Sequence, residues 1–446
     1  MPSKNIIRVS EFEKLYYDDK KPFKQKHWEA LCRYLDNVNK NEQKRIEYFR
    51  IINKGIQFTN YVVVIQAGKL TIEILPKVDK GNTTAANESI EELAEGVSKE
   101  KQKWHNVLLQ MLKECKLLQV NHVDYANLNL RSSSILNIYI ELFLEEAESL
   151  LHEGLLKKYQ KQQGNQTALK GQLLFAKQIA YNSTHQERFF IRYTEYNRNN
   201  IFNQILYKTL QLIPTISNNS YLLDKVGRLL LDFPEVTNCI VTSDTFNRLQ
   251  YDRKTERYKE AMLISKMLLL NYRPDITGGS ENVIAILFDI NKLWEEFVYR
   301  RLKMEEAINN ITVKRQQSAN FWKPDGSNYS KKIRPDIILK YKEGDIEQTI
   351  VVDTKWKILQ DLTPSDEDLK QMFIYDLFWN CNRSVLLYPA SIEESAYGKY
   401  YNHDLPEEFK GGCSIVTTNV LDGNHQLDRD FGKKILNKII RGALQQ

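Results

Sequence analysis

Two short apolar segments that flank a glycine-containing turn constrain the fold of this chain more than any other feature. Residues 333–341 (IRPDIILKY) and 347–354 (EQTIVVDT) are rich in aliphatic and β-branched residues, and the KEGD sequence between them is typical of a turn. The two segments therefore predict an antiparallel hairpin. A turn centred on the Gly-Asp step pairs residues whose numbers sum to 689, and Asp336 and Asp353 form such a pair.

In this register the two aspartates face each other on one side of the hairpin, with their Cβ atoms roughly 4.5–5.5 Å apart. Two carboxylates this close repel each other unless a cation lies between them, and Mg²⁺ prefers such oxygen ligands. Lys355 follows Asp353 by two residues, so strand alternation places its ammonium on the same face. There it could stabilise charge that develops on a phosphate. A register shifted by one residue would separate the carboxylates.

An aspartate two residues before a lysine is a weak signal in a chain with 57 Asp and Glu and 63 Lys and Arg residues. Asp19 and Lys21 repeat the pattern, and we interpret that segment as a solvated charge cluster. The context gives Asp353 more weight, because it ends an apolar strand and has a second aspartate opposite. An earlier helical segment also carries Glu295 and Glu296 among apolar residues, and periodicity alone leaves open which of the two faces the site.

Composition places the chain among globular proteins with more than one domain. It has 446 residues, of which 42% are hydrophobic and 27% charged, with a net charge of +6 that is compatible with a polyanionic partner. The five cysteines and seven histidines are scattered and predict neither a disulfide framework nor a zinc site. No signal sequence or membrane-spanning segment is evident, so we expect a cytoplasmic protein without membrane contact. The sequence contains no G-x-x-x-x-G-K-[ST] motif.

The order of predicted elements indicates an α/β (α+β) protein in three parts. Residues 1–125 predict a strand-containing domain with two strands about Gly68, residues 126–255 a helical middle region, and residues 256–446 a domain with a central mixed sheet flanked by helices. Helical periodicity extends over residues 104–118, 134–160, 196–213, 255–272, 284–304, 366–380 and 430–442, and buried strands are expected at residues 384–389 and 413–418. Residues 161–166 are predicted to be a polar break, and Ser365 an N-cap.

Residues 284–388 resemble the PD-(D/E)xK nuclease superfamily. Pro335-Asp336 matches the PD, Asp353-Thr354-Lys355 matches the (D/E)xK, and Gln371 and Tyr375 match the QxxxY element of its RecB-like branch. More narrowly, the chain is similar to the McrC family, the nuclease subunits of McrBC 5-methylcytosine-specific restriction systems. The segments that carry this similarity are LWEEF at 293–297, TIEILPKV at 71–78, LKGQL at 169–173 and RYTEY at 192–196. Trp294 stands where the family usually has Phe, and residues before 50 and at 80–103 are not matched.

The resemblance implies roles for individual residues. Asp336, Asp353 and the main-chain carbonyl of Thr354 would bind Mg²⁺, and Glu295 would complete the acidic cluster directly or through water. Lys355 would orient or activate the attacking water.

Gln371 and Tyr375 would position their helix against the DNA or the hairpin. The implied reaction is hydrolysis of DNA phosphodiester bonds.

The resemblance also implies a partner. McrC subunits dock, through their N-terminal region, on a hexameric McrB-like AAA+ GTPase that recognises methylated double-stranded DNA, so GTP would be bound only by that partner. In this chain the docking region would be residues 1–125, and Lys77 of the Pro-Lys motif would be structural. Two alternatives remain open from the sequence: a DNA-binding regulator of a AAA+ motor that does not cleave, and a stand-alone RecB-like exonuclease.

Overall fold

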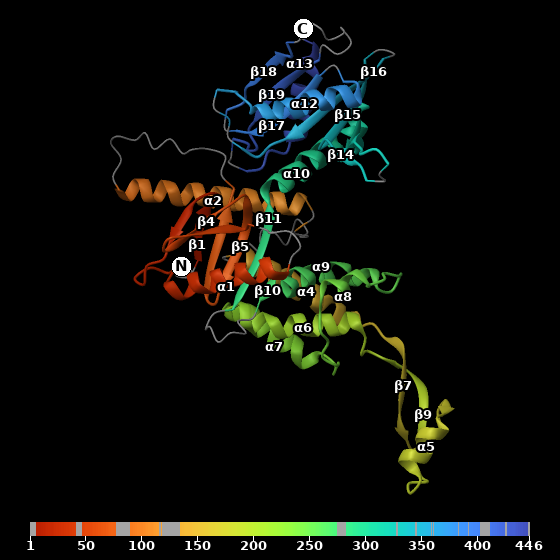
Figure 1. The fold of residues 1–446 in the computed structure, drawn as a ribbon. Helices are drawn as coiled ribbons and strands as arrows, with labels where there is room; N and C mark the ends of the chain where they lie inside the picture. Colours follow the sequence, from red (N-terminus) through yellow and green to blue (C-terminus); the bar gives the residue numbers. More distant parts are fainter. Residues whose placement is uncertain are drawn as a thin grey trace.

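The protein is described by a computed structural model, and its account is confined to part of the chain. The described residues are 6–41, 47–76, 90–115, 117, 134–273, 282–326, 329–343, 346–357, 359, 361–381, 383–390, 392–401, 411–423 and 426–444. Figure 1 shows two stacked sheet-containing bodies, with a helical layer and a slender arm at the opposite end from the C-terminus.

The N-terminal body is built on a five-stranded mixed sheet with the strand order β1-β6-β5-β11-β10. Its strands are β1 (Ile6–Ser10), β5 (Tyr61–Ala67), β6 (Leu70–Leu75), β10 (Tyr272–Arg273) and β11 (Val283–Asp289). Gly68 adopts a positive φ of 57° in the turn between β5 and β6, as the sequence predicted. The body also contains a small antiparallel sheet and two helices: β2 (Lys14–Tyr16), β3 (Phe49–Ile52), β4 (Gly55–Phe58), α1 (Gln25–Asn41) and α2 (Ile90–Glu114).

The middle of the chain forms the helical layer and the arm. The helices are α4 (Ile135–His152), α6 (Ile201–Ile216), α7 (Ser220–Asp232), α8 (Ser243–Asn247), η1 (Glu256–Tyr258) and α9 (Lys259–Asn271). The arm consists of β7 (Lys158–Gln166), β8 (Gln172–Leu173), α5 (Phe175–Asn182) and β9 (Phe189–Asn197). It extends away from the helices as a long antiparallel ribbon (Figure 1).

The C-terminal body contains a six-stranded mixed sheet with the order β12-β15-β16-β17-β19-β18. The strands are β12 (Thr312–Arg315), β15 (Ile337–Glu343), β16 (Ile346–Thr354), β17 (Arg383–Pro389), β18 (Ser395–Lys399) and β19 (Gly412–Thr418). Strands β16, β17 and β19 are parallel, whereas the other neighbours are antiparallel. The helices are α10 (Ile290–Met304), α11 (Glu306–Asn309), α12 (Asp366–Trp379) and α13 (Phe431–Leu444). The predicted mixed α/β fold is thus confirmed.

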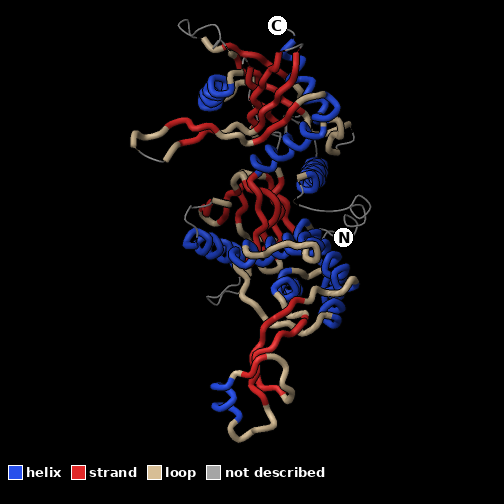
Figure 2. Tube along the Cα trace, turned by 90° about the vertical axis from the view of Figure 1, so that its right-hand side faces the viewer, coloured by secondary structure: helices blue, strands red, loops and turns tan. Residues whose placement is uncertain are grey.

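A second hairpin, β13 (Ala319–Trp322) and β14 (Lys331–Ile333), lies outside this sheet. Figure 2 shows it projecting sideways from the C-terminal body.

The two faces of the C-terminal sheet pack into different cores. Val352 of β16 belongs to the main core, which includes Trp294 of α10 and Phe431 of α13 and continues into the N-terminal body. Val351 packs instead into a smaller core with Met372 of α12. Because side chains alternate along a strand, Asp353 lies on the α12 face.

The structure departs from the sequence predictions at several elements. Strands β10 and β11 follow residue 256, where the C-terminal domain was predicted to begin. They nevertheless pair within the N-terminal sheet, where β11 pairs directly with β5. Helix α4 ends at His152, and residues 158–166, predicted as helix end and polar break, form β7. Half-buried and exposed positions alternate along β7, but the half-buried positions carry Lys, Gln and Gly, so the strand lacks the apolar alternation that identifies a strand. Strands β12, β13, β14 and β18 were not predicted.

Some predictions fall outside the described residues. These are the Gly344-Asp345 step at the centre of the hairpin turn and Lys77 of the Pro-Lys motif. Within the described part of the chain, no helix combines the length and apolar character needed to cross a membrane.

Candidate active site

The predicted hairpin register is confirmed. Ile337 pairs with Val352 and Glu343 with Ile346, so paired residue numbers sum to 689. Beyond Ile337 the two strands no longer continue as a simple ladder. The Asp336 carboxylate accepts hydrogen bonds from Thr354, 2.8 Å from its main-chain N and 2.9 Å from its Oγ1. The side chain of Asp336 thus takes the place of a ladder partner where β15 begins.

Asp353 is the most deeply buried carboxylate at this end of the hairpin. Its residue is only 1% exposed, and β16 holds it in place because Asp353 also pairs with Leu386 of β17. The Lys355 ammonium lies 2.7 Å from Asp353 Oδ2. Burial, followed by the nearby charge of Asp336, raises the pKa of Asp353 to about 7.

The three acidic residues predicted for the site influence one another. Burial raises the pKa of Asp336, although its hydrogen bonds to Thr354 oppose the shift. Glu295 extends from α10, and its pKa is raised by burial and then by the charge of Asp336. Glu296 instead forms ion pairs with Arg300 and Arg315. The structure therefore places Glu295 on the side of the site, whereas Glu296 is occupied by arginines.

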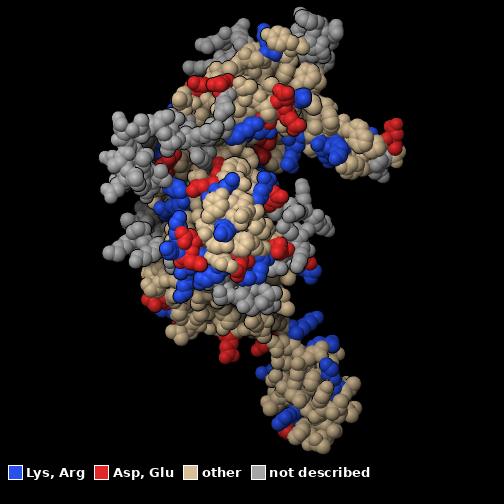
Figure 3. Space-filling model, turned by 60° about the vertical axis from the view of Figure 1, so that its left-hand side comes forward, with Lys and Arg blue, Asp and Glu red and all other residues tan. Residues whose placement is uncertain are grey.

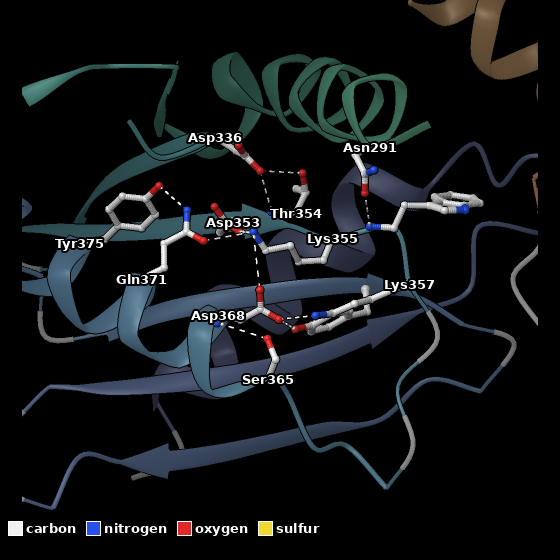
Figure 4. A network of polar contacts seen from close by, with 12 residues as sticks. Asn291, Asp336, Asp353, Thr354, Lys355, Lys357, Ser365, Asp368, Gln371 and Tyr375 are labelled. Atoms are coloured by element: carbon white, nitrogen blue, oxygen red, sulfur yellow. Dashed lines mark hydrogen bonds and ion pairs between the residues drawn. The ribbon is translucent and has the colours of Figure 1, made fainter. Parts of the chain in front are cut away.

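Helix α12 brings Gln371 and Tyr375 to the lysine (Figure 4). Lys355 Nζ donates to Gln371 Oε1 at 3.2 Å, and Gln371 Nε2 donates to the Tyr375 hydroxyl at 2.7 Å. The hydroxyl in turn donates to the main-chain carbonyl of Arg334 at 2.9 Å. Since Arg334 lies two residues before Asp336, this chain of hydrogen bonds joins the lysine to the start of the other strand. Ser365 caps the helix as predicted by accepting from the main-chain N of Asp368.

Sequence reasoning missed two charged residues at the site, Asp368 and Lys357. Asp368 forms an ion pair with Lys357 and lies 3.8 Å from the Lys355 ammonium. Its position in the first turn of a helix suggested only an interaction with the helix dipole. The spacing of residues 368, 371 and 375 contained the signal, because i, i+3 and i+7 share one face of a helix.

These contacts determine the charge state of Lys355. Burial acts to lower its pKa, but the carboxylates of Asp353, Asp368 and Asp336 outweigh burial and raise the pKa above its ordinary value. The lysine is therefore a stable ammonium at neutral pH. It lies at the centre of a cluster of opposite charges on the α12 face of the sheet (Figure 4).

The side chains fit a divalent cation held by few protein ligands. Within the described part of the chain, no group of three or more His, Cys, Asp or Glu residues is close enough to form a metal cage by itself. Asp336 and Asp353 nevertheless supply carboxylate oxygens, and the buried Asp353 Oδ2 lies against the Lys355 ammonium at 2.7 Å. Burial is the first cause of the raised pKa of both carboxyls, and the charge of Asp336 adds to the shift of the Asp353 pKa, so a cation beside them would favour their ionised forms. Such a donor set suits Mg²⁺, which retains several waters when one or two carboxylates bind it.

Comparisons with known proteins identify the family to which the chain belongs. A family model described as the McrBC 5-methylcytosine restriction system component matches residues 56–389. A chain in the structure of Thermococcus gammatolerans McrB AAA+ hexamers with bound McrC is similar over 97% of this chain and 100% of that chain, with 19% identity and a TM-score of 0.68.

A chain of the Thermococcus gammatolerans McrBC complex has 20% identity over 67% of this chain and 87% of that chain, with a TM-score of 0.49. No curated protein matches this chain. The family match spans well over half of the sequence and includes both strands of the hairpin, the Gln371–Tyr375 pair and most of the N-terminal sheet. The chain therefore belongs to the family of McrBC 5-methylcytosine restriction system components.

Proposed function

We propose that this chain is a magnesium-dependent DNA endonuclease subunit that hydrolyses phosphodiester bonds within an McrBC-like restriction complex in the cytoplasm. The observation that carries the proposal is the cluster formed by Asp336, Asp353 and Lys355. A buried carboxylate pair has a folding cost, and a protein that only binds DNA has no evident use for negative charge beside a phosphate. The family membership supports the restriction context.

Each residue has a distinct role in the proposed reaction. Asp336, Asp353 and the main-chain carbonyl of Thr354 would hold Mg²⁺, with Glu295 contributing directly or through water. The bound metal would supply Lewis acidity toward the phosphate and its leaving oxygen.

Lys355 would remain protonated, orient the attacking water and stabilise the added charge at the phosphorus. The hydrogen-bond chain through Gln371 and Tyr375 would hold the ammonium toward the substrate.

We further propose that the chain works with a hexameric AAA+ GTPase that selects methylated double-stranded DNA. Support comes from the similar solved assembly, which contains McrB AAA+ hexamers with bound McrC. The arm is the element best suited to dock on such a partner. Tyr159, Phe175, Ile179 and Tyr181 of the arm are between 64% and 76% exposed, and exposed apolar side chains gathered in this way mark interaction sites.

The docking role of the arm can be tested by removing it without breaking the fold. Lys158 and Asn197 are paired across β7 and β9, so a short turn can join the chain at that point. The shortened chain should fold but fail to stimulate GTP hydrolysis by the partner. Normal stimulation would place the docking surface elsewhere, for example in residues 1–125.

The nuclease activity can be tested by Asp353→Ala in the complete complex with Mg²⁺, GTP and methylated duplex DNA. Cleavage should be abolished, whereas complex assembly and GTP hydrolysis should remain. Asp19→Ala, a change in the solvent-exposed charge cluster, is the matched control and should cleave like wild type. Magnesium-dependent cutting by the Asp353→Ala complex would contradict the proposal.

The same assay separates the alternative functions. Wild-type complex that hydrolyses GTP but leaves every DNA intact would indicate a regulator that does not cleave. Degradation of linear DNA by the isolated chain, without any motor, would indicate a stand-alone exonuclease. We expect cleavage only with the partner, and we expect chelation of the divalent metal to stop it.

A further inference from the structure

A polar groove opens directly beside the candidate active site. It has a volume of about 800 Å³ and lies between the base of the β13–β14 hairpin and helix α12. Its lining includes Gln316, Lys332, Arg334, Lys370, Gln371 and Tyr375. Two of these residues also contact the active site, since Gln371 accepts from Lys355 and Gln316 donates to Glu295 at 2.7 Å. A ligand in the groove would therefore continue into the carboxylate and lysine cluster.

The groove lining carries the cations Lys332, Arg334 and Lys370 against one carboxylate, Glu367. Lys332 and Lys370 are exposed, and neither makes an ion pair with any residue that the structure describes. Nearby cations behave differently, because Arg315 pairs with Glu296 and Lys340 pairs with Glu347. What distinguishes the lysines of the groove is their place, since they lie with Arg334 beside the candidate active site and give that surface a positive charge that suits an anionic ligand.

Aromatic side chains project from the same hairpin. Phe321 is 47% exposed and Trp322 is 55% exposed, although both are large and apolar. Phe321 lies 5.8 Å from the Phe378 ring of α12, which ties the hairpin to the helix that lines the groove. Figure 3 shows Lys and Arg side chains gathered where this hairpin leaves the C-terminal body. Basic and aromatic residues that alternate on one element are typical of nucleic-acid surfaces.

We propose that the β13–β14 hairpin and the groove at its base form a clamp for duplex DNA that holds the backbone next to the scissile phosphate. This inference rests on the proposed nuclease function and assigns the surface that presents the substrate to it. Lys332 and Lys370 bind backbone phosphates, and Trp322 packs against the sugar and base edges of the same strand. DNA fits better than an acidic protein, because the groove leads to a cluster suited to a phosphodiester.

The phosphate contacts can be tested through the salt dependence of binding. The full chain carrying Asp353→Ala binds duplex DNA without cutting it, and its affinity is measured by fluorescence anisotropy at several salt concentrations. Lys332→Ala/Lys370→Ala in that background should lower the slope of log affinity against log salt by roughly two, since each phosphate contact contributes about 0.9. Affinity should fall roughly tenfold at low salt.

A matched control removes the same charge elsewhere. Lys20→Ala/Lys21→Ala changes two exposed lysines of the N-terminal body and should leave the slope within experimental error of the parent. An unchanged slope in the groove variant would overturn the inference, and so would an equal fall in the control. In the wild-type complex, the groove substitutions should raise KM for DNA several-fold while kcat stays within about twofold.

The hairpin has its own optical readout. Trp322 is exposed, so duplex DNA that packs against it should quench its fluorescence. Trp322→Phe keeps a flat ring and should retain affinity within about threefold while losing that quench. The chain has six tryptophans, so the test is the size of the signal, and a DNA-induced quench that is undiminished in Trp322→Phe would exclude the hairpin from the clamp. If the clamp variants behave like wild type in a complex that cleaves DNA, the inference fails and the nuclease function stands; a complex that never cleaves refutes the function itself.

Discussion

Glu11 and Trp356, which lie 345 residues apart in the sequence, form a hydrogen bond of 2.7 Å between Glu11 Oε1 and the indole Nε1. Both residues are buried, with 5% of their surface exposed. The main-chain N of Glu11 donates to Leu75 at 2.9 Å, which fixes Glu11 to the end of the N-terminal sheet. Trp356 directly follows Lys355, so a residue of the N-terminal body holds the chain just beyond the lysine proposed to be catalytic.

Replacing Glu11 should therefore affect both stability and cleavage. Glu11→Ala leaves a buried indole N–H without its acceptor, which should lower the free energy of unfolding by about 1–3 kcal/mol. Cleavage by the complex should fall because Lys355 loses one of its supports.

Glu11→Gln retains an oxygen acceptor and should restore most of both quantities, and Glu13→Ala, on the exposed part of the same segment, should change neither by much. Urea unfolding and single-turnover cleavage measure the two effects. Full cleavage by Glu11→Ala would show that the contact is purely structural.

We expect Asp353 to lower the stability of the metal-free protein and to be required for DNA cleavage. Its buried carboxylate faces Asp336, and its pKa is raised to about 7, so the charged form is unfavourable in the folded protein without a cation. Asp353→Asn removes this repulsion at nearly constant shape, and we expect metal-free protein to gain about 0.5–2 kcal/mol of stability. Cleavage should be lost in the same variant.

Thermal unfolding without divalent metal provides the measurement. Wild-type protein, but not Asp353→Asn, should gain stability when Mg²⁺ is added, because binding to the folded state is coupled to folding. A large loss of stability in Asp353→Asn would show that its ion pair with Lys355 outweighs the repulsion.

Asp368 should support Lys355, the lysine proposed to be catalytic, without binding the proposed metal. Its carboxylate pairs with Lys357 and lies 3.8 Å from the ammonium of Lys355. Asp368→Asn should lower kcat about 10- to 100-fold, the usual range for residues that orient direct ligands, with little change in KM. Asp366→Asn, an exposed substitution in the same helical turn, is the control for the helix dipole. An equal loss in both variants would assign the effect to the helix end rather than to the lysine.

The hairpin could be predicted from sequence because its determinants are local. The alternation of apolar residues and the turn composition defined the register that relates Ile337 to Val352. Asp336, Asp353 and Lys355 then followed from their positions at the strand ends. The structure adds that the pairing of β15 with β16 ends at Ile337 and that the Asp336 side chain accepts a hydrogen bond from Thr354. A pattern of apolar residues cannot predict such a contact.

Long-range pairings could not be predicted in the same way. Strand β11 lies in the part of residues 284–304 that was predicted with the following helix, and nothing in its own sequence identifies β5, more than two hundred residues earlier, as its neighbour. The contact between Glu11 and Trp356 could not be predicted either, because a single Glu in a polar N-terminal segment is expected to be exposed to solvent. The arm was missed for a different reason, because the half-buried positions of β7 in its three-stranded sheet carry Lys, Gln and Gly rather than apolar side chains.

Asp376 gives a prediction on pH dependence that is independent of catalysis. Burial raises its pKa to about 8, and the nearest described polar partner is Ser384, whose hydroxyl donates to Asp376 Oδ2 at 3.1 Å. The folded protein therefore retains a proton on Asp376 that the unfolded chain releases near pH 4. Between about pH 4 and pH 8 the folded state binds the extra proton, so this group's contribution to stability is full below that window and is lost as the pH rises through it.

Asp376→Asn should remove this dependence, because an amide of the same shape does not titrate. The variant should be about 1–3 kcal/mol more stable than wild type near pH 8, where the native carboxyl begins to carry an unpaired buried charge. At pH 4 the two proteins should be nearly equal. Urea unfolding across this pH range measures the difference, and cleavage should be unaffected because Asp376 lies among Ser384 and Cys381 rather than beside Lys355. Parallel pH profiles for the two proteins would show that Asp376 is already ionised in the folded state.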